Sequence, residues 1–221
     1  MFVLRVEVIP AILSKTSDDL MSKINLVFPY VNHIQLDIMD GIFVPNKTVG
    51  VNELKNLPKA KYEFHWMVKD PLNWIIHFPG DHLHLVHVET IDRKSFDEIY
   101  SLVKKQGGRL GLVINPSTPL ENLLVYLSNS KKLSPVCQVL IMTVNPGFSG
   151  QKYIYEMEKK IKTLRSLYPN LDIEVDGGIN LETIRHAYSS GANLLAAASA
   201  IFSESDISKA VENLKKKAIL G

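Results

Sequence analysis

Four polar residues interrupt strongly apolar stretches of the chain, where their side chains could do chemistry. They are Gln35, Asp37, His65 and Asp176. An uncompensated charge in an apolar segment is costly, and two neighbouring carboxylates need a metal ion or a proton to relieve their repulsion. If the two aspartates and the histidine converge, they predict a metal site or an acid–base site. The structural alternative is a set of hydrogen-bonded polar side chains that plug the interior.

The segments around these residues alternate between polar and apolar positions as β-strands do. Within residues 33–39, Gln35 and Asp37 share one face of the strand, and the intervening apolar residues share the other. His65 and Met67 share a face in a second segment of this kind. Each of the polar side chains is therefore expected within or at the end of a buried strand.

Strand-like segments recur eight times along the chain, and segments with helical spacing or helix-capping residues follow them. The helix at 93–106, for example, ends at Gly107 and Gly108, which suit a C-terminal cap. The predicted strands are residues 2–13, 33–39, 62–68, 83–88, 109–114, 139–144, 171–175 and 193–198. The predicted helices include residues 71–78, 93–106, 152–167 and 180–191, a helix from Thr118 and Pro119, and a final helix that closes the chain.

Eight strand–helix units in 221 residues are the pattern of a closed (β/α)8 barrel, or TIM barrel. We therefore predict an α/β fold with one domain over residues 1–221. A doubly wound open sheet is the alternative, but no Gly-x-Gly-x-x-Gly follows the first predicted strand. In a barrel, functional residues lie at the carboxyl ends of the strands, where the four polar residues are expected.

Loops with glycines follow the sixth and seventh predicted strands, and Ala198-Ser199 begins a helix after the eighth; all three segments could bind an anion. Backbone N–H groups at the start of a helix attract phosphate, and the loops after the seventh and eighth strands are the usual phosphate site of this fold. Each glycine alone is equally well explained as a turn residue. The predicted phosphate- and substrate-binding residues are Gly147, Phe148, Ser149, Gly150, Gly177, Gly178, Ala198 and Ser199.

Three methionines fall near the ends of predicted strands. Methionine is often core filler, but its apolar thioether could also line a dry pocket above a reacting carbon. The predicted pocket-lining residues are Met39, Met67, Met142 and Ser14. The strand histidines His33, His84 and His87 are weaker candidates, and we interpret His33 as a hydrogen-bonded interior residue.

Composition excludes several classes of protein. The formal net charge of +2 gives no basic surface for nucleic acid. No stretch approaches the roughly 18 apolar residues of a membrane span, and the start of the chain does not look like a signal peptide. The single cysteine, Cys137, cannot form an intrachain disulfide. We therefore expect a soluble protein of the reducing cytoplasm, without a nucleic-acid or membrane partner.

The chain resembles the ribulose-phosphate 3-epimerase family, a family of phosphate-binding TIM barrels, from the first predicted strand to the last helix. Two long motifs carry the resemblance: Leu-Asp-Ile-Met-Asp-Gly-Ile-Phe-Val-Pro-Asn at 36–46 and Met-Thr-Val-Asn-Pro-Gly-Phe-Ser-Gly-Gln at 142–151. The other matching segments, in the family's order, are Pro-Ala-Ile-Leu-Ser at 10–14, His-Trp-Met-Val at 65–68, Asn-Pro-Ser-Thr-Pro at 115–119, Glu-Val-Asp-Gly-Gly-Ile at 174–179 and Ser-Ala-Ile-Phe at 199–202.

The resemblance implies a metal-assisted 1,1-proton transfer at C3 of a ketopentose phosphate, between D-ribulose 5-phosphate and D-xylulose 5-phosphate, as in the pentose phosphate pathway. Asp37 and Asp176 would stand on opposite faces of this sugar phosphate, as general acid and base. One divalent metal ion (Zn, Mn, Fe, Co or Mg) would bind Asp37, His65, Asp176 and, most weakly, Gln35, and would stabilise the enediolate oxygens. The resemblance also implies that homo-oligomers can form.

Three positions depart from the family's pattern. The family has a histidine metal ligand where this chain has Gln35, and an amide oxygen is a poorer partner for zinc than imidazole. A family serine is replaced by Ala11, and a family glycine by Ala198. Two alternatives therefore stay open: a related epimerase for a ketohexose phosphate, and a barrel that binds a sugar phosphate through an eroded metal site without turning it over.

Overall fold

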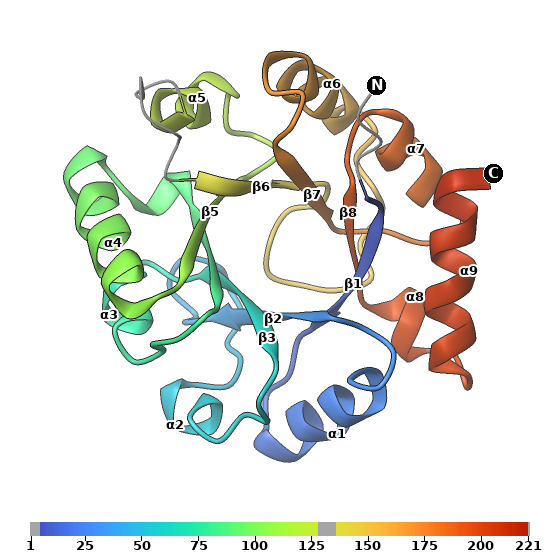
Figure 1. Cartoon of the computed structure of the whole chain (residues 1–221), viewed down its shortest axis with the longest axis horizontal. Helices are drawn as coiled ribbons and strands as arrows, with labels where there is room; N and C mark the ends of the chain where they lie inside the picture. The colour runs from blue at the N-terminus through green and yellow to red at the C-terminus, as the bar shows by residue number, and fades with distance from the viewer. Residues whose placement is uncertain (1–4, 128–135, 221) are drawn as a thin grey trace.

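Eight parallel strands close into a barrel in the order of the sequence, from β1 to β8 and back to β1 (Figure 1). The computed structural model describes residues 5–127 and 136–220. The prediction of a single (β/α)8 barrel is confirmed. The strands are β1 (Glu7–Ile12), β2 (His33–Met39), β3 (Lys61–Met67), β4 (Leu83–His87), β5 (Arg109–Ile114), β6 (Val136–Met142), β7 (Asp172–Asp176) and β8 (Leu194–Ala197).

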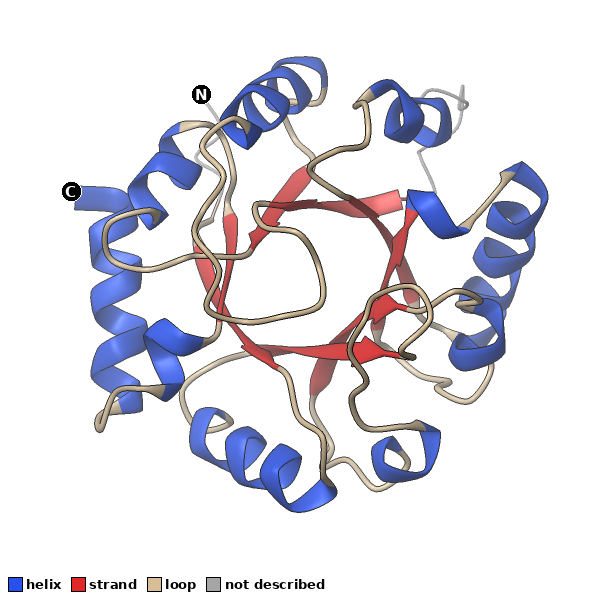
Figure 2. Cartoon of the chain, turned by 180° about the vertical axis from the view of Figure 1, so that it is seen from behind, coloured by secondary structure: helices blue, strands red, loops and turns tan. Residues whose placement is uncertain are grey.

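Helices surround the barrel and cover the outer face of its strands (Figures 1 and 2). Most of them lie where helical spacing predicts them, and α4 has the predicted bounds. The helices are α1 (Ser17–Val27), α2 (Val51–Leu54), α3 (Leu72–Ile75), the 3-10 turn η1 (Val88–Thr90), α4 (Arg93–Gln106), α5 (Glu121–Leu127), α6 (Met157–Leu167), α7 (Ile184–Ser189), α8 (Ser199–Phe202) and α9 (Ile207–Leu220).

Alternation along each strand separates two apolar layers. The outward-facing residues of β2, Ile34, Leu36 and Ile38, pack in the large core between the strands and the helices. A smaller apolar cluster, which includes Leu85 and Leu140, fills part of the barrel interior. The polar residues of the strands therefore lie inside the barrel, at levels that the register between neighbouring strands sets.

The strand register brings the predicted site residues together. On β2 and β3, Asp37 is the direct partner of His65. On β6 and β7, Met142 is the direct partner of Asp176. Each of these residues lies in the last few positions of its strand, so their side chains meet at the carboxyl end of the barrel.

The segment after β6 differs from the prediction. Helix α6 begins at Met157, and not at residue 152, because the preceding residues continue as a loop over the barrel. The backbone N–H of Ile154 donates to Thr143 O at 2.8 Å, which ties this loop to the end of β6. The loop also meets the β2 loop, since Asn46 Nδ2 donates to Gly147 O at 2.8 Å. Figure 2 shows loops crossing the mouth of the barrel.

Candidate active site

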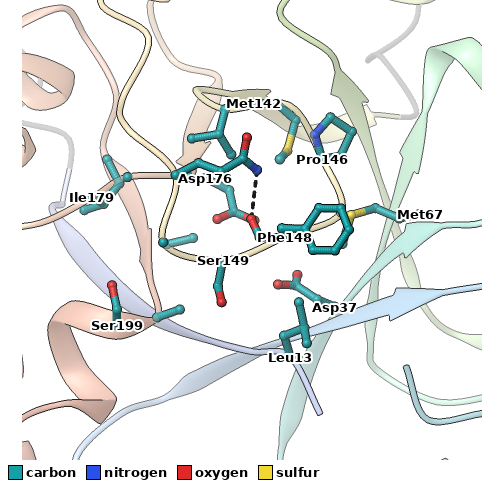
Figure 3. Close-up of a pocket in the computed structure, with 18 of the residues that line it drawn as sticks. Leu13, Asp37, Met67, Met142, Pro146, Phe148, Ser149, Asp176, Ile179 and Ser199 are labelled. Atoms are coloured by element: carbon teal, nitrogen blue, oxygen red, sulfur yellow. Dashed lines mark hydrogen bonds between the residues drawn. The ribbon is translucent and has the colours of Figure 1, made fainter. Parts of the chain in front are cut away.

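A cavity opens at the carboxyl ends of the strands, beside the loops that follow β6 and β7 (Figure 3). Asp37 lines it from β2 and Asp176 from β7. Two groups of residues predicted from the sequence line the same cavity. They are the methionines Met39, Met67 and Met142, and all eight candidates for phosphate binding, Gly147, Phe148, Ser149, Gly150, Gly177, Gly178, Ala198 and Ser199.

The expectation that Ser14 lines this cavity is wrong. Ser14 lies beyond the end of β1, and its hydroxyl donates to Asp19 Oδ2 at 2.6 Å. This bond turns the side chain toward α1. Leu13, the preceding residue, lines the cavity instead.

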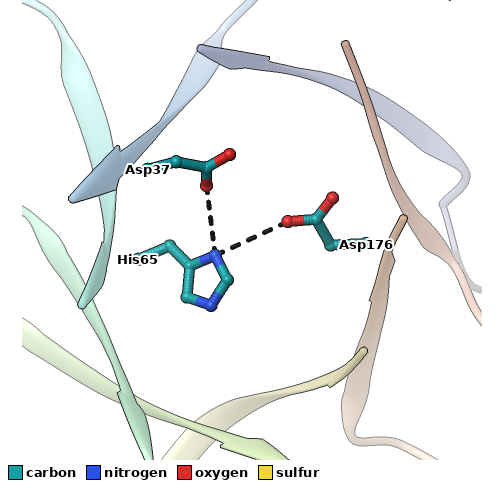
Figure 4. Close-up of side chains that lie close together, drawn as sticks. All are labelled: Asp37, His65 and Asp176. Carbon is teal, nitrogen blue, oxygen red and sulfur yellow. Dashed lines mark hydrogen bonds and ion pairs between the residues drawn. The ribbon is translucent and has the colours of Figure 1, made fainter. Parts of the chain in front are cut away.

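Asp37, His65 and Asp176 form a compact cluster at the base of the cavity (Figure 4). His65 Nδ1 lies 3.1 Å from Asp37 Oδ1 and 3.5 Å from Asp176 Oδ2. His65 is fully buried, and Asp37 is buried as well. The convergence predicted from three distant segments is therefore present, and one imidazole nitrogen faces two carboxylates.

The charges in this cluster shift one another's protonation. Burial, and then the charge of Asp176, raise the pKa of Asp37. Burial alone would lower the pKa of His65, but hydrogen bonds to Asp176 and Asp37, together with their charges, outweigh it and raise that pKa to about 9. Without a bound cation, His65 therefore carries the positive charge that offsets the two carboxylates.

Gln35 bridges the two aspartates. Its Nε2 donates to Asp37 Oδ1 at 2.9 Å and to Asp176 Oδ2 at 2.7 Å. Its other terminal atom, Oε1, is buried and has no hydrogen-bond partner among the described residues. The amide thus separates the carboxylates with a neutral donor.

The donor atoms of this cluster fit a divalent cation. The ligand atoms of Asp37, His65 and Asp176 all lie within 4.8 Å of one another, and two carboxylates with one imidazole are a common donor set for such ions. The nitrogen and oxygen of an amide exchange places by rotation of the side-chain end. A rotated Gln35 would present its unpartnered Oε1 to a cation.

A second histidine lies directly behind His65. The Nε2 atoms of His65 and His87 are 2.9 Å apart, and the two rings stack with centroids 5.1 Å apart. His87 Nδ1 lies 3.2 Å from Glu89 Oε2. From the sequence, His87 was only a weak candidate for the site, and Glu89 was not a candidate. The available signal was their spacing, because His87 ends β4 on the inward face and Glu89 follows it by two residues.

The other strand histidines, His84 and His33, contact residues outside the cavity. His84 Nδ1 accepts a hydrogen bond from Trp66 Nε1 at 3.1 Å, on the outer side of the barrel wall. His33 lies at the opposite end of the barrel interior, with Nδ1 3.5 Å from Glu7 Oε1. Neither residue contacts the cavity.

A comparison with protein-family models matches residues 7–202 to the ribulose-phosphate 3-epimerase family. The match covers most of the chain and includes the cavity. The chain belongs to the ribulose-phosphate 3-epimerase family. Within the described residues of this family member, no helix is both long enough and apolar enough to cross a membrane.

Curated members of the ribulose-phosphate 3-epimerase family are similar over most of their length. The cytoplasmic isoform of ribulose-phosphate 3-epimerase from Oryza sativa subsp. japonica is 38% identical over 188 residues, which cover 83% of this chain and 81% of that protein. The ribulose-phosphate 3-epimerase of Methanocaldococcus jannaschii is 38% identical over 86% of this chain and 80% of its own. That of Schizosaccharomyces pombe is 31% identical over 96% and 94%.

Solved structures with the same fold are more distant in sequence. The 3-hexulose-6-phosphate synthase from Salmonella typhimurium matches with a TM-score of 0.72 and 16% identity, over 96% of this chain and 98% of that one. KGPDC from Streptococcus mutans in complex with D-R5P matches with a TM-score of 0.74 and 11% identity, over 98% and 99%. These likenesses support the barrel fold.

The structure shows where the three residues that depart from the family's pattern lie. Ala11 is the register partner of Gln35 on β1, so the absent serine hydroxyl would have lain beside that amide. Ala198 lines the cavity with φ −108°, so this backbone conformation does not require glycine. Gln35 is the departure that changes the centre of the cluster.

Proposed function

We propose that this protein is a ribulose-phosphate 3-epimerase that interconverts D-ribulose 5-phosphate and D-xylulose 5-phosphate. One observation carries the proposal: Asp37 and Asp176, from strands on different sides of the barrel, face one cavity that also contains the predicted phosphate-binding loops (Figure 3). The family's relatives bear this name in a plant, a yeast and an archaeon.

In the proposed reaction, the two carboxyl groups exchange one proton with C3. One ionised carboxylate removes the proton from C3, which leaves an enediolate that is planar at C3. The other carboxyl group, protonated beforehand, delivers its proton to the opposite face. Because burial and the Asp176 charge raise the pKa of Asp37, this residue holds a proton more readily than an exposed aspartate would. The reverse reaction exchanges the two roles.

Asp37, His65 and Asp176 would hold a divalent metal ion, with Gln35 Oε1 as a fourth donor after rotation of its amide. When bound, such an ion supplies Lewis-acid stabilisation of negative charge on the oxygens at C2 and C3. With an amide in place of an imidazole, the donor set is richer in oxygen, which favours Mn²⁺ or Mg²⁺ over Zn²⁺.

The remaining residues of the cavity would bind and shield the substrate. Met39, Met67 and Met142 offer apolar, polarisable side chains that exclude water from the planar intermediate. Backbone N–H groups in the β6 and β7 loops and at Ser199 would bind the phosphate group. The predicted binding role of Phe148, Ser149 and Gly150 rests on their place in the β6 loop at the cavity.

The intact acid–base pair favours this reaction over a barrel that only binds a sugar phosphate, since binding alone does not require two facing carboxylates. We further propose that the enzyme acts in the cytoplasm, in line with the name of the rice relative. Homo-oligomer formation stays a prediction.

Two substitutions test the proposed roles. We expect Asp37→Asn and Asp176→Asn each to lower kcat for C3 epimerisation by about 10²–10⁴-fold, because each removes one half of the proton transfer. Steady-state assays in both directions measure the effect. Asp97→Asn makes the same chemical change on exposed α4 and should leave kcat unaltered. Wild-type activity in either cavity variant would refute the two-base assignment.

A further inference from the structure

His65 is the last member of a chain of hydrogen bonds that begins outside the cavity. The backbone N–H of Asn115 donates to Glu89 Oε1 at 2.8 Å. The other oxygen, Glu89 Oε2, lies 3.2 Å from His87 Nδ1. His87 Nε2 in turn lies 2.9 Å from His65 Nε2. Both rings are completely buried, so water does not compete for these contacts.

The chemistry of Glu89 sets the direction of this chain. An ionised carboxylate only accepts hydrogen bonds, so the proton on His87 must lie at Nδ1. The two facing Nε2 atoms can share only one proton between them. If His87 is neutral, its Nε2 is bare and accepts from His65 Nε2–H.

The opposite arrangement would place a positive charge on His87 and leave His65 Nε2 without a proton. His65 is the better place for a positive charge, because its Nδ1 lies between two carboxylates, at 3.1 and 3.5 Å. A proton shared by the two rings therefore stays on His65 Nε2. The Nδ1 atom of His65 is then the nitrogen that binds either a proton or a metal ion.

We propose that Glu89 and His87 are positioning residues that fix the tautomer of His65, so that Nδ1 presents its lone pair to the divalent cation between Asp37 and Asp176. The proposal rests on the proposed function, because it gives that function's metal ligand its orientation. Neither His87 nor Glu89 contacts the cation or the substrate in this account. Partners of this kind orient many metal-binding histidines and raise their affinity for the ion.

Glu89→Gln is the substitution that reverses the chain without changing its shape. The backbone N–H of Asn115 still needs an acceptor, so the new amide oxygen takes that contact. The amide NH2 then faces His87 Nδ1 and requires it to be bare. His87 must carry its proton at Nε2 and donate it to His65 Nε2, so that His65 keeps a proton only at Nδ1. Thr118, whose hydroxyl also bonds Glu89, can donate or accept and adapts to either group.

Two measurements test the proposal. In metal-free wild-type protein, ¹⁵N NMR of the histidine rings should show His87 protonated at Nδ1 and bare at Nε2, and Glu89→Gln should invert this pattern. Titration with Mn²⁺ should show affinity about 10–100-fold weaker in Glu89→Gln than in the wild type. Glu98→Gln, which removes an exposed carboxylate from α4, should leave both unchanged.

Two results would overturn the proposal: a wild-type His87 protonated at Nε2, or wild-type Mn²⁺ affinity in Glu89→Gln. Neither result would affect the proposed function if the wild type still epimerises the pentose phosphates. A wild type that binds no Mn²⁺ and shows no epimerisation would instead contradict the proposed function. In that case the NMR measurement of the His87 tautomer would still test the direction of the hydrogen bonds from Glu89 to His65.

Discussion

Gln35 decides how the two aspartates coexist. Its amide donates to both carboxylates, while His65 supplies a positive charge beside them. A divalent cation bound between the aspartates would take the place of the Gln35 N–H groups and of the proton on His65. The Gln35 amide would then have to rotate. The strength of metal binding therefore depends on the free energy needed to break two buried hydrogen bonds at Gln35.

Restoring the imidazole should strengthen metal binding. We expect Gln35→His to raise the affinity for Zn²⁺ by at least about 10-fold, because imidazole is a better ligand for zinc than an amide oxygen and replaces a side chain that competes with the ion. Isothermal titration with Zn²⁺ measures the change. Equal affinity in the two proteins would show that Gln35 does not limit the site.

Glu63 lies deeper in the barrel and should make stability depend on pH. Burial raises its pKa to about 7, so the folded chain holds this proton more tightly than the unfolded chain does. The proton on Glu63 stabilises the folded state fully below pH 4.5, and this stabilisation is lost as the pH rises through about 7. Glutamine at position 63 does not titrate. The difference in free energy of unfolding between Glu63→Gln and the wild type should therefore shift by about 2–3 kcal/mol in favour of the variant as the pH rises from about 5 to about 8. Urea unfolding at both pH values measures this gain, and a constant difference would contradict the account.

The sequence was informative for residues whose polarity conflicts with an apolar strand. Gln35, Asp37 and His65 were found in this way. His87 was not, because its partner Glu89 lies beyond the strand and the contact between His65 and His87 depends on the pairing of β3 with β4. Ser14 was misplaced, because its hydroxyl bonds Asp19 in α1, a contact that the residues around it do not predict.

Among the elements, the β7 loop is the most constrained part of the cavity. Gly178 has φ 66°, and a Cβ there would lie 2.6 Å from the backbone nitrogen of Tyr153 in the β6 loop. The two loops that line the predicted phosphate site therefore pack backbone to backbone. A side chain at this position would force them apart.

Gly178→Ala should lower stability and weaken phosphate binding together. Gly107→Ala is a matched control outside the cavity, because Gly107 at the end of α4 also has positive φ (82°), but a Cβ there would meet no atom of the described residues within 4 Å. The control should lose only the conformational cost of about 1 kcal/mol, and Gly178→Ala should lose more. Thermal unfolding and inorganic phosphate titration measure both. Equal losses in the two variants would show that the close packing has no effect.

Element boundaries were predicted well where local signals exist. Gly107 marked the end of α4 in the sequence, and in the structure Asp92 also caps its start. The start of α6 was predicted too early, because the backbone N–H of Ile154 donates to Thr143 O, just beyond β6, and this contact holds the segment as a loop. Tertiary contacts of this kind leave no trace in local spacing.

For the whole molecule, barrel closure brings together residues that are far apart in the chain. The hydrogen bond from Gln35 to Asp176 joins residues 141 positions apart. The sequence predicted the closed barrel from its eight repeated units and predicted that these residues converge. It could not predict that Gln35 lies between the two carboxylates, since this depends on the tilt and register of the closed sheet.

The measurement that tests the central claim most directly is C3 epimerisation of D-ribulose 5-phosphate in D₂O with Mn²⁺, followed by proton NMR. Two facing carboxyl groups predict that D-xylulose 5-phosphate forms and carries deuterium at C3, because the group that delivers the proton exchanges with solvent before each turnover. Inversion that retains the original C3 proton, or no inversion in the presence of Mn²⁺, would contradict the account.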